Sequence, residues 1–434
     1  MILLLLLLSF LLSVFKPYYF VIVYGLIGND MGSRGITGFI ETLYPNYTLI
    51  MRVLLVISTI VATSRFYGLK NTIKARKWIQ LSWCYITMMI VMLTLCSSSL
   101  TISSYLSRVT LAIATFGPGV FIIWMAYADK FDHKKWFLIY SVCQCLIAFA
   151  VIYGSYAGIS WFQLFNAGLY NSEYFYLDEN NDMIALPSNF YLTFLGKNSY
   201  FIRCGQFHNA NGLGFASGVL VFLLLYYFFN TKLKINKLIC LFCVPLAFLL
   251  WCNTGTRGPI VGIIVAFLAY NFIGKKKSQL MPLVILAIAA IVVVLFCESS
   301  FFSYFFGGGA DASYASRKEL NDNTFKHIGE FFLIGSGGDL DSMFNRGIDP
   351  HELPLRILCL YGIIPAIFVF ILTVVCPAIS ILRHRNNITI YSISLFCMVL
   401  LVSLTNNFSE GVLFWLAFGE SMLELEVSSN LFNE

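Results

Sequence analysis

A short polar stretch near the C-terminal end of the chain contains residue types that can do acid–base chemistry. The stretch IDPHELPLRILCLYG (348–362) carries His351, Glu352 and Arg356, and it opens onto the apolar run GIIPAIFVFILTVV. An imidazole titrates near neutrality and can take a proton from a hydroxyl group, and a carboxylate within hydrogen-bond reach can do the same. We therefore predict His351 and Glu352 as candidate catalytic bases.

Two simpler interpretations of this stretch stay open. Glu352 and Arg356 are four residues apart, which is the spacing of an ion pair along one helix face. His351 follows Pro350, so it can instead be a loop residue that caps the following helix.

Arginines form a second group of candidates. They stand near the ends of apolar runs at Arg203, Arg257, Arg317, Arg346 and Arg356. Arginine keeps its charge at any pH and can grip a phosphate through two parallel hydrogen bonds. A bound anion explains the group, whereas any single arginine can simply extend its charge to the membrane interface.

Arg257 lies in NTGTRGPIVGIIVAF, where the local sequence favours an anion site. Gly255 and Gly258 free the backbone, and Pro259 suits the first turn of a helix. The unpaired amide groups of that turn and the guanidinium can then point at one anion. The alternative is an ordinary turn with a capping threonine.

Arg203 begins a second polar entrance, RCGQFHNANGLG. Ten residues lie between Arg203 and Gly214, and ten also lie between His351 and Gly362. Both entrances therefore combine polar residues with a glycine farther down the following helix. Glycine permits close helix contact in a membrane.

Motifs for other chemistry are weak or missing. The chain has no G-x-x-x-x-G-K-S/T loop for ATP, and its twelve cysteines show no zinc spacing. Asp339 and Asp341 are too few carboxylates to indicate a divalent cation site. We expect neither a cofactor nor a metal.

Composition places these residues in a membrane protein. Of the 434 residues, 59% are hydrophobic and 12% are charged, against about 25% charged in ordinary globular proteins. The net charge of +6 does not indicate a nucleic-acid partner, because the lysines and arginines cluster in short loops between apolar runs.

Apolar runs predict an all-α, polytopic integral membrane protein with about twelve transmembrane helices in one membrane domain, residues 1–434. The start, MILLLLLLSFLLSVF, lacks a basic region and a cleavage site, so we expect a retained first span. The predicted spans are 2–27, 48–69, 79–98, 109–127, 136–154, 206–229, 238–252, 258–273, 280–298, 354–377, 388–404 and 411–424.

Basic loops predict the orientation of the spans. Two spans separate each loop from the next, so all the loops can face the cytoplasm and both termini are predicted there. The loops are KNTIKARK (70–77), DKFDHKK (129–135), TKLKINK (231–237), GKKK (274–277) and RHR (383–385).

Two long loops are then predicted on the periplasmic side, at 155–205 and 299–353. Loops of this length are usually functional or disordered. The first is rich in aromatic residues, which argues against disorder. Its rings can hold sugars, or they can form an aromatic belt at the membrane interface.

Several stretches, in this order, resemble the O-antigen polymerase and ligase superfamily. They lie between residues 203 and 370, and the first half of the chain matches only in being a bundle of spans. The matching stretches are RCGQFHNANGLGFA (203–216), NTGTRGPIVGIIVAF (253–267), SRKELNDNTFKHIGEFFLIGSGGDLD (316–341) and DPHELPLRILCLYGIIPAIFVF (349–370).

The resemblance implies a GT-C-like glycosyltransferase of the bacterial inner membrane. It would act at the periplasmic face on glycans linked to undecaprenyl diphosphate, within the membrane lipid, with neither nucleotide sugar nor metal. By position, Arg203, Arg257 and Arg317 would hold the diphosphate, with Arg356 beside them, and His351 would be the base.

Departures from the family pattern leave two activities open. The family often has His-Asn where this chain has His351 and Glu352. A histidine at position 351 favours a ligase. The stretch GQFHNANGLG, in contrast, is more similar to the polymerases. We expect a polymerase first, with a chain-length regulator as a further partner, and a ligase that transfers glycan to lipid A–core second. A repeat-unit flippase is the alternative of another class, but the two halves of the chain differ, which disfavours a transporter.

Overall fold

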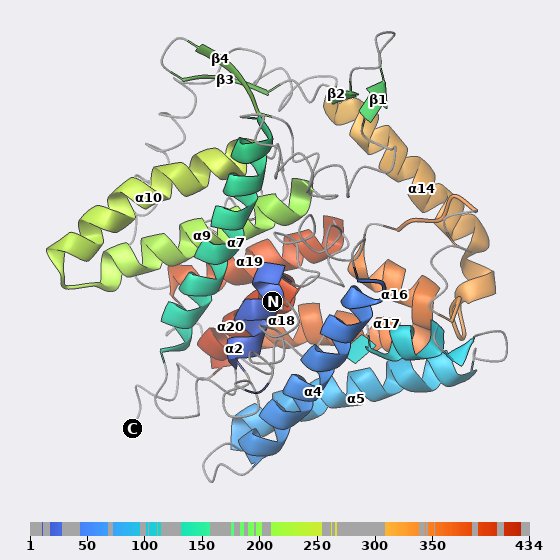
Figure 1. Ribbon diagram of the computed structural model, residues 1–434. Coiled ribbons are helices and arrows are strands. Elements are labelled where there is room, and N and C mark those ends of the chain that lie inside the picture. The colour runs from blue at the N-terminus through green and yellow to red at the C-terminus, as the bar shows by residue number, and fades with distance from the viewer. Residues whose placement is uncertain are drawn as a thin grey trace.

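The computed structural model describes most of the predicted spans and parts of both long loops (Figure 1). In some of these elements only the backbone is described. The described residues are 11, 18–27, 44–67, 73–95, 101–102, 104–110, 112–113, 132–156, 175–177, 183–185, 190–194, 197–201, 210–253, 262, 265–266, 309–337, 343, 346–350, 352–383, 389–405 and 412–426.

Helices make up the described bundle and overlap all but three of the predicted spans, so the helical class is confirmed. The spans predicted at 109–127, 258–273 and 280–298 lie mostly or wholly outside the described residues. The helices of the bundle are α2 (Tyr18–Ile27), α4 (Tyr47–Tyr67), α5 (Ile73–Leu95), α7 (His133–Tyr156), α9 (Ala210–Asn230), α10 (Lys234–Asn253), α16 (Leu353–Tyr361), α17 (Ile363–Phe370), α18 (Cys376–Arg383), α19 (Ile390–Thr405) and α20 (Val412–Glu426).

α9 is the central helix of the bundle. It contacts α7, α10, α19 and α20, and its residues 214–225 are all buried. The sequence GFASGVLVFLLL suits this position, because a helix that is apolar on every side lies in a protein core or within a membrane. Gly218 lies in the crowded centre, where an added Cβ would be 3.0 Å from Met398 Sδ.

Many large apolar side chains face outward, which suits a lipid environment. On α10, at the edge of the bundle in Figure 1, they include Phe242 and Leu246, exposed by 67% and 65%. By length and composition, Tyr47–Arg65 and Ile363–Arg383 are the two described helices able to cross a bilayer. Shorter apolar helices occur at Ile79–Leu95, Gly214–Asn230 and Ile390–Leu404. These features fit a membrane protein.

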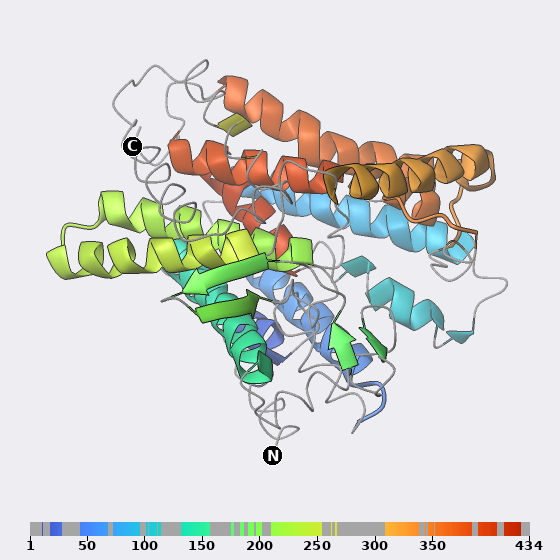
Figure 2. The same ribbon diagram turned by 90° about the horizontal axis from the view of Figure 1, so that it is seen from above.

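The two segments predicted as long loops contain regular structure. In 155–205 there are two antiparallel hairpins, one of β1 (Phe175–Leu177) with β2 (Met183–Ala185) and one of β3 (Phe190–Phe194) with β4 (Lys197–Phe201). In the first Phe175 pairs with Ala185, and in the second Phe190 pairs with Phe201. The segment 299–353 contains α14 (Gly309–Phe331), a long polar helix that runs beside α16 (Figure 2).

The helix between 353 and 383 is interrupted twice. Gly362 separates α16 from α17, and a π-helical segment, η2 (Ile371–Val375), separates α17 from α18. Pro377 accounts for η2, because proline has no N–H and its ring clashes with the carbonyl one turn earlier. Within η2, the Thr373 hydroxyl donates a hydrogen bond to the Val369 carbonyl at 2.7 Å.

The turn at 332–337 docks on the break at Gly362. The Ser336 amide donates to the Cys359 carbonyl at 2.7 Å, and the Ile363 amide donates to the Phe332 carbonyl at 2.8 Å. The predicted close approach at Gly362 is therefore present, but the partner is this turn and not a second transmembrane helix. The contact fixes the end of α14 against the start of α17.

Glycine is required on both sides of this contact. Gly362 has φ 87° and ψ −178°, a conformation that is essentially confined to glycine. A Cβ at Gly362 would lie 2.2 Å from the Leu333 carbonyl oxygen, and a Cβ at Gly335 would lie 2.4 Å from the Leu360 carbonyl carbon. Both neighbouring atoms belong to the backbone, so they cannot move aside as the end of a flexible side chain could.

We predict that Gly362→Ala destabilises the protein by more than about 2 kcal/mol, because it adds backbone strain to a steric clash. The measurement is the thermal unfolding midpoint of the purified full-length protein in detergent. Gly329→Ala on α14 is the matched control, since nothing lies within 4 Å of a Cβ there. An equal fall in both variants would contradict the prediction.

Candidate functional site

The N-terminal end of α16 carries the predicted catalytic stretch. Glu352 occupies the N-cap position with φ −80° and ψ 127°, and Pro354 stands in the first turn, where its missing N–H leaves no gap in the helix ladder. Pro350 and Leu353 are buried, so the chain enters the helix in a fixed direction. The polar side chains of this entrance are thereby held over the adjoining α14.

Arg356 forms an ion pair with Asp349. Its Nη1 donates to Asp349 Oδ1 at 2.7 Å, and the Arg356 residue is only 7% exposed. A guanidinium so far from water requires such a partner, because a buried unpaired charge is strongly destabilising. The pair connects α16 to the loop that precedes it. Whether Arg356 also binds a diphosphate stays a prediction.

Glu352 faces α14. Its Oε1 accepts a hydrogen bond from Asn321 Nδ2 at 3.0 Å, and both residues are partly buried. The predicted base therefore has a defined partner across the helix interface. Asn321 was not among the residues singled out from the sequence, where nothing distinguishes it from other polar residues of the segment.

Further contacts hold α14 and the following turn in place. Arg108 Nη1 donates to the Gly337 carbonyl, which links the segment around 101–113 to the turn. On the surface, Glu330 accepts hydrogen bonds from His327 and Arg346. The hydrogen bond from His327 and the charge of Arg346 lower the pKa of the Glu330 carboxyl. Exposed pairs of this kind contribute little to stability.

The structure brings only some of the predicted site residues together. Glu352 and Arg356 lie on the same end of α16, where α14 contacts that helix. Arg317 is on α14, four residues before Asn321, which places its backbone about one turn away. The positions of His351, Arg203 and Arg257 lie outside the described residues.

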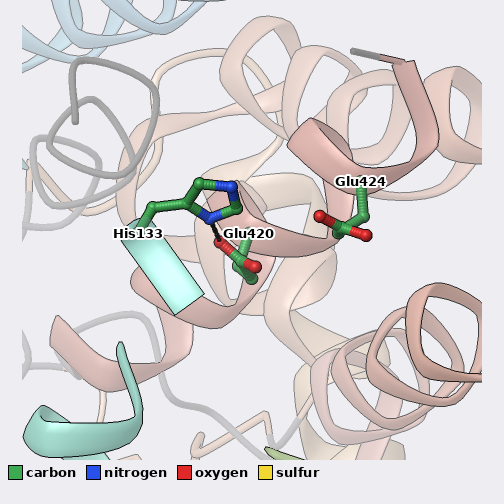
Figure 3. Close-up of side chains that lie close together, drawn as sticks. All are labelled: His133, Glu420 and Glu424. Atoms are coloured by element: carbon green, nitrogen blue, oxygen red, sulfur yellow. Dashed lines mark hydrogen bonds and ion pairs between the residues drawn. The ribbon is translucent and has the colours of Figure 1, made fainter. Parts of the chain in front are cut away.

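A second polar cluster, which the sequence did not lead us to expect, lies between α7 and α20 (Figure 3). His133 Nδ1 is 2.7 Å from Glu420 Oε2, and Lys134 Nζ is 2.5 Å from Glu424 Oε1. The Tyr391 hydroxyl also donates to Glu420, at 3.4 Å. Glu420 is fully buried and Glu424 is 8% exposed. We call His133, Lys134, Glu420 and Glu424 the α7–α20 cluster.

Three charges in the α7–α20 cluster oppose the dipole of their own helix. His133 and Lys134 begin α7, where negative charge is preferred, and Glu424 lies in the last turn of α20, where positive charge is preferred. The two ends meet, so each helix supplies the counter-charge of the other. A signal was present in the sequence, since two glutamates four apart interrupt the apolar run 411–424.

Electrostatics in the α7–α20 cluster favour the protonated forms of His133 and Lys134. Burial lowers the pKa of the His133 imidazole, but the charge of Glu420 and the hydrogen bond to it outweigh burial, so the pKa lies above its ordinary value. The pKa of Lys134 is raised by Glu424 and Glu420, against the effect of burial. Lys134 also lies over the Tyr226 ring, 5.0 Å from its centroid.

The same side chains include a possible ligand set for a divalent cation. Donor atoms of His133, Glu420 and Glu424 lie within 4.8 Å of one another, and nitrogen with carboxylate oxygens suits zinc or manganese. A cation there would have to displace a proton from His133 and separate Lys134 from Glu424. The two pairs already neutralise both carboxylates, so the geometry favours the ion-paired form.

We predict that stability falls as the pH rises above about 6.5, through deprotonation of His133. With a folded pKa above the unfolded value of about 6.5, the stabilisation is complete below that value and is lost as pH rises through the folded pKa. The measurement is the thermal unfolding midpoint as a function of pH. His133→Gln should lack the pH-dependent fall in the midpoint that His133 causes. His327→Gln, a change at an exposed histidine, should show the same fall as the wild type. A His133→Gln curve with the wild-type slope would sink the prediction.

Comparison with known proteins identifies one segment of the chain. No curated protein and no solved structure matches the chain. The family model described as O-antigen ligase matches residues 241–370. This segment includes α14, the docked turn and the entrance to α16. The resemblance to the O-antigen polymerase and ligase superfamily is therefore confirmed by this match over residues 241–370.

Proposed function

We propose that this chain is an O-antigen polymerase of the bacterial inner membrane. It transfers a growing glycan from undecaprenyl diphosphate onto a new lipid-linked repeat unit at the periplasmic face. The family match supports an O-antigen ligase or polymerase type of function, and such a function implies lipid-linked oligosaccharide substrates. The polymerase activity, the carrier lipid and the side of the membrane are parts of the proposal.

One observation carries the proposal: the family match covers the candidate chemistry. Its boundaries, 241–370, enclose all the predicted site residues except Arg203. Within this segment the described part of α16 holds Glu352 and Arg356 at one helix end, over α14. These two site residues therefore lie at the end of a helix and not halfway along it, which suits an enzyme acting at a membrane surface.

The reaction breaks the bond between the anomeric carbon and the diphosphate oxygen. The acceptor hydroxyl attacks that carbon from the opposite face, which inverts the sugar, and the bonding electron pair leaves with undecaprenyl diphosphate. Arg203, Arg257 and Arg317 bind the leaving group, where positive charge stabilises the departing anion. His351 accepts the proton of the hydroxyl.

The helix arrangement supports the predicted topology. The α7–α20 cluster, with Tyr226 and Tyr391, gathers the starts of α7 and α19 and the ends of α9 and α20. The predicted orientation places all of these helix ends on the cytoplasmic side. The entrance to α16 is predicted on the periplasmic side, so the proposed active site and the α7–α20 cluster lie at opposite faces.

A ligase that transfers finished glycan to lipid A–core is the second candidate. Two observations favour it: the description of the matching family model, O-antigen ligase, and the histidine at position 351. The GQFHNANGLG stretch, which is more similar to the polymerases, lies outside the match and keeps the polymerase first.

We predict that deletion of the gene leaves lipopolysaccharide that carries a single repeat unit, as resolved by gel electrophoresis. A ligase would instead leave polymer on the carrier lipid and no attached glycan. Repeat units stranded on the inner leaflet would identify a flippase and overturn the enzyme assignment.

We further predict that His351→Ala and Arg257→Ala each abolish complementation of the deletion strain, because the base or the counter-charge of the leaving group is missing. Membrane-fraction immunoblots check that each variant is inserted. His327→Ala is the matched control, an exposed histidine that should complement fully. Near-normal polymer with both test variants would contradict the site assignment.

A further inference from the structure

A groove runs between α4 and α5, which follow each other in the chain. Its volume is about 820 Å³, within the range of about 300–1,000 Å³ that is usual for small-ligand sites. One face of each helix lines it, with residues spaced three or four apart from Ile60 to Tyr67 and from Gln80 to Met88. Ile60, Gln80 and Cys84 are exposed, so the groove is open to the surroundings. We call it the α4–α5 groove.

The α4–α5 groove is apolar, although several of its residues carry hydroxyl groups. Trp83 Nε1 donates to Thr63 Oγ1 at 3.1 Å, which joins the two helices beneath the groove. The hydroxyls of Thr63, Ser64 and Thr87 each donate to a carbonyl three or four residues earlier in their own helix. The polar atoms are thus used within the helix pair, and mainly carbon atoms face the groove. Such a surface suits a hydrocarbon chain.

Positive charge lies at the end of the α4–α5 groove that is nearer the connecting loop. The Arg76 guanidinium is over the ring of Tyr67, a groove residue, 5.9 Å from its centroid. Lys77 is exposed and precedes Gln80 by three residues, so it extends the groove face of α5 by one turn. Residues 42–128 contain no aspartate or glutamate, so the helix pair supplies no carboxylate to offset these charges.

A hydrocarbon groove that ends in two cations selects an amphiphile with an anionic head. Within a bilayer, an anionic phospholipid has this chemistry, and basic segments at the cytoplasmic surface attract such lipids. The loop 70–77 is predicted on the cytoplasmic side, whereas the glycan-bearing lipid of the proposed reaction is at the periplasmic face. The charge and the predicted orientation therefore both favour a phospholipid over the lipid-linked substrate.

We propose that the α4–α5 groove binds one anionic phospholipid, with an acyl chain along the groove and the phosphate between Arg76 and Lys77. From Gln80 to Met88 the groove follows eight residue steps of α5, or about 12 Å at 1.5 Å per residue. The part of the acyl chain nearest the head group lies in this length. The inference goes beyond the proposed function, because it depends on the membrane setting and not on glycan transfer.

The test compares two lipids that have the same chains, of which only the first has a net negative charge. Full-length protein in detergent is titrated with dioleoyl phosphatidylglycerol or dioleoyl phosphatidylcholine, and the bound fraction is measured by native mass spectrometry. The wild type should bind phosphatidylglycerol more tightly. Lys77→Gln should weaken that binding about fivefold, the equivalent of ~1 kcal/mol for one basic residue beside an anionic lipid. Its binding of phosphatidylcholine should not change.

Cys84→Trp tests the groove itself, because the larger side chain occupies the space of the acyl chain and should weaken the binding of both lipids. Lys237→Gln is the matched control for charge, at an exposed lysine of another predicted cytoplasmic loop. Leu246→Trp is the matched control for bulk, at an exposed position of α10. Both controls should bind as the wild type does, and unfolding midpoints establish that the variants are folded.

Equal affinity of the wild type for the two lipids overturns the proposal, as does an equal loss of affinity in Lys77→Gln and Lys237→Gln. Tighter binding of undecaprenyl phosphate than of phosphatidylglycerol would make the carrier lipid the occupant, and would overturn it too. Because Lys77 is exposed, its variant keeps the comparison decisive even where Cys84→Trp does not fold.

Discussion

A polar or charged group inside an apolar bundle needs a partner, because water cannot reach it. In this chain the partners come from neighbouring segments, so the polar contacts also decide which segments lie together. Arg356 of α16 faces Asp349 of the preceding loop, and Glu352 faces Asn321 of α14. The α7–α20 cluster does the same at other helix ends. Apolar packing alone would leave these relative positions poorly specified.

The entrance to α16 combines these polar contacts with a close backbone contact. The turn at 332–337 can approach α16 and α17 only because Gly335 and Gly362 have no side chains. α14 is thereby fixed at its end by the turn and near its middle by Asn321. A polar helix that is held at two points can present residues to a substrate with little loss of conformational freedom on binding.

Hydropathy predicted the helical class correctly, and described helices overlap most of the predicted spans, since about twenty apolar residues in a row have few other solutions. It could not find α14, because a polar segment such as SRKELNDNTFKHIGE reads as a loop on that scale. The partner of Glu352 depends on how α14 packs against α16, and no spacing along the chain encodes it. Glu420 and Glu424 carried a usable signal, but their partners on α7 are nearly 300 residues away in sequence.

The π-helical segment η2 has a consequence for comparing this chain with its relatives. A π-turn holds one residue more than an α-turn, so it is equivalent to a single inserted residue, and each residue turns an α-helix by roughly 100°. A relative that lacks one residue within 371–375 would form a regular helix there. The wide turn absorbs the extra residue locally, so in such a relative the side chains equivalent to Ser380 and Ile381, both buried here, would keep their faces toward the core. A one-residue gap at this position in an alignment would therefore mark the loss of the wide turn, with the helix faces on both sides of it preserved.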